Sequence, residues 1–187
     1  MKTAVQAAVI WLAGVLAVGG QSSVGEWTVS LRGVGPLTIG ASLGEVRRIL
    51  GDPTAILRLS LHDARPPLPR EADDSPCAYL ATTKVPNQIG LMFQRGRLAR
   101  IDVWKSGIRT IGGAQVGDSE ARILELYGAG IKVTQHDYPP VGAHYMILTP
   151  VDTEDHACQM LFETDGTKVT RFRVGLREAV ALKEGCL

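Results

Sequence analysis

The side chains best suited to catalysis or metal binding are those of two histidines on either side of a proline pair. His136 and His144 have seven residues between them, including Asp137 and Pro139-Pro140. Imidazole and carboxylate groups bind zinc and act as general bases. The spacing is not one of the short spacings common in metal sites, but the two rings could face each other across an antiparallel hairpin. One hypothesis is therefore a metal-dependent or hydrolytic enzyme with its site near His136 and His144. The alternative is that these residues are only polar residues at strand ends and in loops.

No sequence motif specifies a reaction. The chain contains no Gly-x-Ser-x-Gly nucleophile motif, no glycine-rich phosphate loop and no His-Glu-x-x-His. Lys and Arg total 20 against 19 Asp and Glu, and aromatic residues make up 5%. A nearly neutral chain with few aromatic residues is a poor match for nucleic acid. We therefore favour a non-catalytic protein and expect no cofactor, no metal and no nucleic-acid partner.

The three cysteines allow one disulfide and leave one thiol over. Cys158 is in phase with apolar residues of a predicted strand, so we expect it to be a buried thiol. Cys77 ends a proline-rich segment, and Cys186 is next to last in the chain. Both positions are free to approach each other, which predicts a Cys77–Cys186 disulfide.

The N-terminal residues have the pattern of a secretory signal peptide. A positive start at Lys2 precedes an uncharged run from Ala4 to Gly19, and small and polar residues follow. We assign residues 1–20 to this signal peptide, and the alternative is an uncleaved membrane anchor. The mature chain is then expected to be periplasmic or secreted, with no integral membrane span. No cysteine follows the apolar run, so we expect no lipid anchor on the mature N-terminus.

The mature chain contains an internal repeat. Segments 37–51 and 114–128 each have an aliphatic residue before glycine, a serine two residues later and a second glycine eleven residues after the first. Each predicts a short helix that ends at glycine. Ser42 and Glu45 have the spacing of a capping box at the first helix. A duplication that serves stability alone would explain the repeat equally well.

Each predicted helix is followed by segments typical of antiparallel strands. Residues 91–103 and 160–174 each predict two strands joined by a tight turn. Further strands are predicted at 56–61, 78–83, 131–135 and 144–148, and residues 63–76 are predicted to be a surface loop. The expected fold is α+β, with two tandem repeats that each pack a short helix on about four antiparallel strands. We assign residues 21–107 to the first unit and 108–187 to the second.

Several short motifs resemble those of a family of exported bacterial proteins without an established activity. They are Gly117-Asp118-Ser119-Glu120-Ala121, His144-Tyr145, Phe162-Glu163-Thr164-Asp165-Gly166 and Glu184-Gly185-Cys186. More distantly, the repeated unit is similar to β-lactamase inhibitory protein and to outer-membrane assembly lipoproteins of the SmpA/OmlA type. This resemblance implies a protein that binds other proteins without catalysis, in the inhibitor through the concave face of its sheet. The lipoproteins differ in having one unit and a lipidated cysteine.

Alternation along the strands separates an apolar face, which includes Ala99, from a polar face that we expect to be open. On the polar face we predict a partner-binding surface formed by Met92, Gln94, Arg100, Asp102, Trp104, Glu163, Arg171 and Arg173. Tryptophan and arginine often contribute most of the binding energy at protein interfaces. The function predicted is an exported protein-binding module whose partner is another envelope or extracellular protein, and we expect a monomer.

The alternative is a solvated face whose cross-strand ion pairs each contribute ~0.2–1 kcal/mol. In both cases an open face contributes little to folding. We therefore expect alanine at Arg100, Trp104 and Arg173 together to leave the melting temperature almost unchanged, and to abolish binding if the surface is functional.

Overall fold

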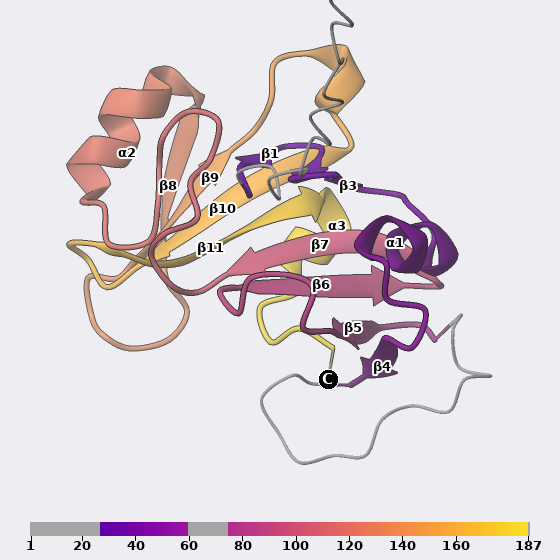
Figure 1. The fold of residues 1–187 in the computed structure, drawn as a ribbon. Coiled ribbons are helices and arrows are strands. Elements are labelled where there is room, and N and C mark those ends of the chain that lie inside the picture. Colours follow the sequence, from indigo (N-terminus) through magenta and orange to yellow (C-terminus); the bar gives the residue numbers. More distant parts are fainter. Residues whose placement is uncertain (1–26, 60–74, 187) are drawn as a thin grey trace, which may run out of the picture.

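The computed structural model describes residues 27–59 and 75–186 (Figure 1). The predicted signal peptide and most of the predicted surface loop at 63–76 lie outside these described residues. In the part of the chain that is described, no helix is long and apolar enough to cross a membrane.

An eight-stranded antiparallel sheet forms the centre of the molecule, in the strand order β4-β5-β6-β7-β11-β10-β9-β8. The first four strands are β4 (Ile56–Arg58), β5 (Ala78–Ala81), β6 (Ile89–Gln94) and β7 (Arg97–Val103). The last four are β8 (Ile131–Gln135), β9 (His144–Leu148), β10 (Cys158–Thr164) and β11 (Val169–Leu176). Strands β7 and β11 pair with each other and join the two halves, as Figure 1 shows. The α+β class and the antiparallel pairing predicted from the sequence are confirmed.

Two helices, α1 (Leu43–Leu50) and α2 (Glu120–Tyr127), lie in the two repeated segments, and α1 begins at the capping box that the sequence predicted. Ser42 Oγ accepts a hydrogen bond from the Glu45 backbone N–H, and the Glu45 carboxylate accepts one from the Ser42 backbone N–H, which completes the capping box. Ser119 Oγ caps α2 in the same way by accepting from the Arg122 N–H. These contacts satisfy N–H groups that have no partner within the helix.

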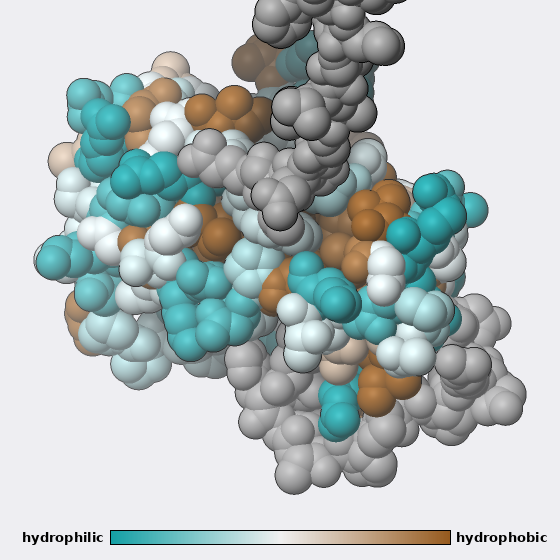
Figure 2. All heavy atoms as spheres, viewed as in Figure 1, coloured by the Kyte–Doolittle hydropathy of each residue, from teal (hydrophilic) through white to brown (hydrophobic). Residues whose placement is uncertain are grey.

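One hydrophobic core joins both halves on the face that carries α1 and α2. It includes Val46 of α1 and Ile123 of α2, packed with Leu91, Phe162 and other strand residues. A three-stranded sheet that the sequence did not predict also contributes to it. Its strands are β1 (Val29–Ser30), β2 (Gly33–Val34) and β3 (Leu37–Thr38). Figure 2, drawn from the same side as Figure 1, shows hydrophilic and hydrophobic residues interspersed over the surface.

A third helix, α3 (Arg177–Ala181), packs on the opposite face of the sheet. Ala179 forms a small apolar cluster there with Met92, Ala99 and Cys186. The prediction that Ala99 belongs to the α1/α2 face is wrong. Met92 pairs with Arg100 but Phe93 pairs with Leu98, and this register shift leaves Ala99 unpaired and on the α3 side beside Met92. Two short 3₁₀ helices, η2 (Gly128–Gly130) and η3 (Thr153–Asp155), complete the secondary structure of the described residues.

The predicted Cys77–Cys186 disulfide is present, with its two Cα atoms 5.3 Å apart. Cys158 is a free, buried cysteine, as expected. Burial raises the pKa of its thiol, so a smaller fraction of Cys158 is present as the reactive thiolate. The disulfide ties the residues after α3 to the start of β5, and so holds the C-terminal segment against the sheet.

Candidate functional site

Half of the residues predicted to form an open surface are buried, and the C-terminal segment, residues 177–186, contacts two of them, Met92 and Arg100. Met92, Arg100, Glu163 and Arg173 are buried, with between 0% and 3% of their surface exposed. The expectation of an open face is therefore wrong at these four residues. At Met92 and Arg100 the reason is α3, which the sequence did not predict. Glu163 is buried beside His136, Arg171 and Arg173.

Arg100 is an anchor for this covering segment. Its Nη1 donates hydrogen bonds to the carbonyl oxygens of Ala179, at 2.8 Å, and Leu182, at 2.6 Å. Its Nη2 donates to the Tyr79 hydroxyl at 2.7 Å, and its Nε donates to Asp102 at 3.1 Å. Burial and the Asp102 charge raise the pKa of Tyr79 to about 12, so the hydroxyl remains protonated. Loss of Arg100 is therefore expected to destabilise the fold, contrary to the expectation from the sequence.

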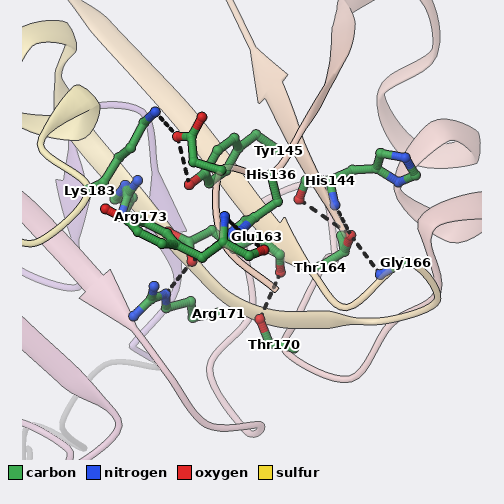
Figure 3. Close-up of polar contacts among 12 residues, drawn as sticks. His136, His144, Tyr145, Glu163, Thr164, Gly166, Thr170, Arg171, Arg173 and Lys183 are labelled. Carbon is green, nitrogen blue, oxygen red and sulfur yellow. Dashed lines mark hydrogen bonds and ion pairs between the residues drawn. The ribbon is translucent and has the colours of Figure 1, made fainter. Parts of the chain in front are cut away.

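Beside this anchor, the buried carboxylate of Glu163 is shared by two arginines from the neighbouring strand (Figure 3). Arg173 Nη1 lies 2.7 Å from Glu163 Oε1, and Arg171 Nε donates to Glu163 Oε2. Arg173 is 3% exposed, and its Nε and Nη2 have no hydrogen-bond partner among the described residues. Burial lowers the pKa of Arg173, and the charge of Glu163 opposes this effect. The pair of cations thus faces one buried anion.

His136 joins the same cluster. Its Nε2 lies 3.5 Å from Glu163 Oε2, and its ring centroid lies 4.3 Å from that of Tyr145. Asp137 forms an ion pair with Lys183, whose ammonium lies 5.5 Å from the centroid of the Tyr145 ring. The cluster therefore links the loop after β8 to strand β10 and to the C-terminal segment.

His144 lies apart from this cluster. Its Nδ1 is 2.8 Å from Glu120 Oε1 at the start of α2, on the opposite side of the sheet from His136. Figure 3 shows the ring of His144 directed away from Glu163. The structure does not bring the two imidazoles together, so they do not form the cross-hairpin pair considered from the sequence. Within the described ranges, no three His, Cys, Asp or Glu side chains are grouped so that they could hold a metal ion.

A pocket of about 340 Å³ opens beside Glu163, where the C-terminal segment does not line it. We call it the Trp104 pocket, and its lining residues are Trp104, His136, Pro139, Pro140, Glu163, Thr164, Asp165, Thr170 and Arg171. The Trp104 indole is positioned by a hydrogen bond from its Nε1 to the Asn87 carbonyl oxygen at 3.1 Å. The Arg171 side chain is 53% exposed and forms part of the wall.

The pocket contains Trp104, Glu163 and Arg171 of the predicted surface. Asp102 is half-buried beside Arg100, and Gln94 pairs with Arg97 at the β6–β7 turn. Sequence analysis placed His136 in a separate hypothetical metal site, and it did not identify the prolines as part of this surface. The sequence offered little indication that these residues lie together, because the pocket combines the loop after β8 with the end of β7, and these segments are distant in the sequence.

The chain matches no protein-family profile, and it matches no curated protein. Among solved structures, it is similar to the crystal structure of the uncharacterized protein yfeY from Escherichia coli. The two chains are 17% identical with a TM-score of 0.38, and the match covers 80% of this chain and 99% of the other.

Proposed function

We propose that this chain is an exported, non-catalytic binding module that acts in the periplasm or outside the cell. Its partner is another envelope or extracellular protein, and its recognition surface is the Trp104 pocket and its rim. The observation that carries this proposal is the position of Trp104 and Arg171 beside a pocket, at the part of the sheet face that α3 does not bury. Large aromatic and arginine side chains beside a pocket are typical anchors of protein interfaces.

The arrangement of charges in the pocket supports binding rather than catalysis. The Glu163 carboxylate forms ion pairs with Arg171 and Arg173, and its Oε1 makes no hydrogen bond among the described residues. The Asp165 carboxylate accepts hydrogen bonds from the Thr167 and Lys168 backbone N–H groups, at 2.9 and 2.8 Å. Both carboxylates therefore hold neighbouring groups in place, the arginines of β11 at Glu163 and the turn N–H groups at Asp165.

We also propose that the fold consists of two tandem repeats. The support is the order of elements along the chain, in which α1 precedes β4–β7 and α2 precedes β8–β11. The sheet order places the two sets of strands side by side, with the last strand of each set at the junction. A duplicated unit would produce this symmetry.

Affinity capture from an envelope extract tests the binding function. The mature chain, with its disulfide intact, is immobilised beside the Trp104→Ala and Arg171→Ala variants. The matched control is Arg122→Ala, which removes an exposed arginine of α2 that pairs with Glu125. We expect the native chain and the control to retain the same protein and the two pocket variants to lose it. Equal retention by all four chains would refute the proposed surface.

The alternative function, a metal-dependent or hydrolytic enzyme near His136 and His144, ranks second. The separation of the two imidazoles by the sheet leaves it without a convergent pair of groups. Native mass spectrometry would support this alternative if it detected a metal ion bound to the native chain and none bound to the His136→Ala variant.

A further inference from the structure

We propose that a second pocket, between β1 and α2, binds a small neutral apolar molecule that carries one hydrogen-bond acceptor, such as the carbonyl oxygen of a ketone or an ester. We call it the Tyr127 pocket, after the tyrosine of α2 that lines it. Three observations carry the inference, which are the apolar walls of the pocket, an unused hydroxyl proton in its lining and the pairing of its charged groups. The pocket shares no lining residue with the Trp104 pocket, so the inference does not depend on the proposed binding function.

The first observation is the size and composition of the Tyr127 pocket. Its volume is about 360 Å³, within the range of ~300–1,000 Å³ of small-molecule sites. Strands β1 and β10, which lie beside each other in Figure 1, supply Val29 and Met160, and both side chains are buried. Leu31, Ile111 and Leu148 complete the apolar walls, and Ile111 is 73% exposed. An apolar molecule in this pocket would be removed from water against these side chains.

The second observation is a hydroxyl proton without an acceptor. Thr110 Oγ1 and the Tyr127 hydroxyl lie 2.6 Å apart, and Thr110 Oγ1 also accepts a hydrogen bond from the Ala114 backbone N–H at 2.9 Å. Each of the two hydroxyl groups carries one proton. Whichever group donates to the other, the second proton has no acceptor among the described residues. Both side chains line the pocket, so this proton is available to an acceptor atom of a ligand.

The surrounding residues hold this hydroxyl pair in place. Thr110 is 3% exposed, and burial raises the pKa of Tyr127, so the tyrosine hydroxyl remains protonated and able to donate. A Cβ at Gly112 would lie 2.9 Å from the Tyr127 hydroxyl oxygen, so glycine allows the phenol to approach the chain closely here. The Tyr127 ring also packs against Phe162, with the ring centroids 5.7 Å apart. A desolvated donor without an acceptor is unfavourable, so a ligand that supplies an acceptor gains binding free energy.

The third observation is that the charged groups at the pocket pair with each other. Arg32 and Asp155 are the charged residues of the lining, and Arg32 Nε donates to the Asp155 carboxylate. Arg32 Nη2 also donates to Glu154 Oε2 at 2.9 Å. The cation is therefore already compensated, and the lining itself is neutral. Because burial of a further charge without a partner is unfavourable, these contacts favour a neutral ligand over a carboxylate or an amine.

Four small probes of nearly the same size test this inference on the mature, disulfide-bonded chain. Acetophenone carries a carbonyl oxygen, and α-methylstyrene replaces that oxygen with a methylene group. Benzoate and benzylammonium carry an anionic and a cationic group in the same place. The readout is the NMR cross-peak of the isotopically labelled methyl group of Met160, which lines the pocket. The methyl group of Met92, buried on the α3 face of the sheet, is the internal control.

We expect acetophenone to shift the Met160 cross-peak with saturation while the Met92 cross-peak stays in place. α-Methylstyrene should bind about two- to tenfold more weakly although it is the more apolar molecule, because it leaves the hydroxyl proton without an acceptor. Benzoate and benzylammonium should bind at least about tenfold more weakly. The inference would be overturned by a lack of saturation with acetophenone up to about 10 mM, by a shift confined to Met92, or by binding of any other probe as tight as that of acetophenone.

The double variant Thr110→Val/Tyr127→Phe tests the hydroxyl pair, because either single variant leaves one donor in the pocket. We expect the double variant to prefer α-methylstyrene to acetophenone, and an unchanged preference would contradict the proposed role. The matched control Thr170→Val/Tyr138→Phe removes two hydroxyl groups outside the pocket and should keep the preference of the native chain. Thr110→Val also leaves the Ala114 N–H without its acceptor. The comparison of the two neutral probes on the native chain therefore decides the inference without relying on a variant that folds.

Discussion

Arg100 on β7 donates a hydrogen bond from Nη1 to the carbonyl oxygen of Ala179 in α3, at 2.8 Å. Both residues are buried, and they are separated by 79 positions in the chain. This contact explains why the polar face of the sheet is not a fully open surface. A cation that could have faced solvent or a partner instead satisfies a backbone acceptor of the C-terminal segment.

Substitution of Arg100 is the first prediction. Arg100→Met should lower the free energy of unfolding by about 3–5 kcal/mol, because it leaves Asp102 and two carbonyl oxygens without their buried partner. Urea denaturation followed by circular dichroism measures the effect. The control Arg122→Met removes an exposed arginine and should change stability by no more than about 0.5 kcal/mol. Similar values for the two variants would contradict the structural role of Arg100.

The disulfide provides the second prediction. It joins residues 109 positions apart, and in the chain-entropy model a loop of this length stabilises the folded state by about 4–5 kcal/mol. Dithiothreitol should therefore lower the free energy of unfolding of the native chain. The double variant Cys77→Ala/Cys186→Ala should be less stable and insensitive to the reductant. Peptide mapping without reduction should recover Cys77 linked to Cys186, and a bridge that involves Cys158 would show the assignment to be wrong.

Gly175 provides the third prediction, because it lies where the two halves of the sheet meet. Its φ is +148°, and a Cβ at this position would lie 2.2 Å from the carbonyl oxygen of Ala99 on β7. Gly175→Ala should therefore lower the free energy of unfolding by at least about 3 kcal/mol. Gly40→Ala is the matched control, since Gly40 also has a positive φ but a Cβ there would meet no atom within 4 Å. Its cost should be about 1–2 kcal/mol, and equal losses would contradict the close approach of β7 and β11.

The fourth prediction concerns acid stability. Hydrogen bonds from the backbone of Lys168 and from Thr167 lower the pKa of Asp165 from 3.8 to about 2. Because the folded pKa is the lower one, this group stabilises the fold fully above pH 3.8, and the contribution is lost as the pH falls toward 2.

Asp165→Asn should therefore flatten the pH dependence of the free energy of unfolding across this window. Thr167→Val, which removes one donor, should have an intermediate effect. An NMR titration of Asp165 with its midpoint near 3.8 would contradict the prediction.

The features that the sequence determined on its own are those with local causes. The helices after Ser42 and Ser119 were predictable because a capping serine and a terminal glycine act within one or two turns. The β6–β7 and β10–β11 hairpins were predictable because alternation and turn residues are also local. The disulfide could be predicted because the strand phase of Cys158 left only Cys77 and Cys186.

The tertiary structure alone decided which of these elements meet. Strands β1–β3 have two residues each, too few to show a periodicity, and α3 is only five residues long. Alternation separates the two faces of a strand but does not state what covers them, so it could not show that α3 packs on Met92 and Arg100. The Trp104 pocket depends on the spatial order of the strands, which long-range pairing sets and no single segment encodes.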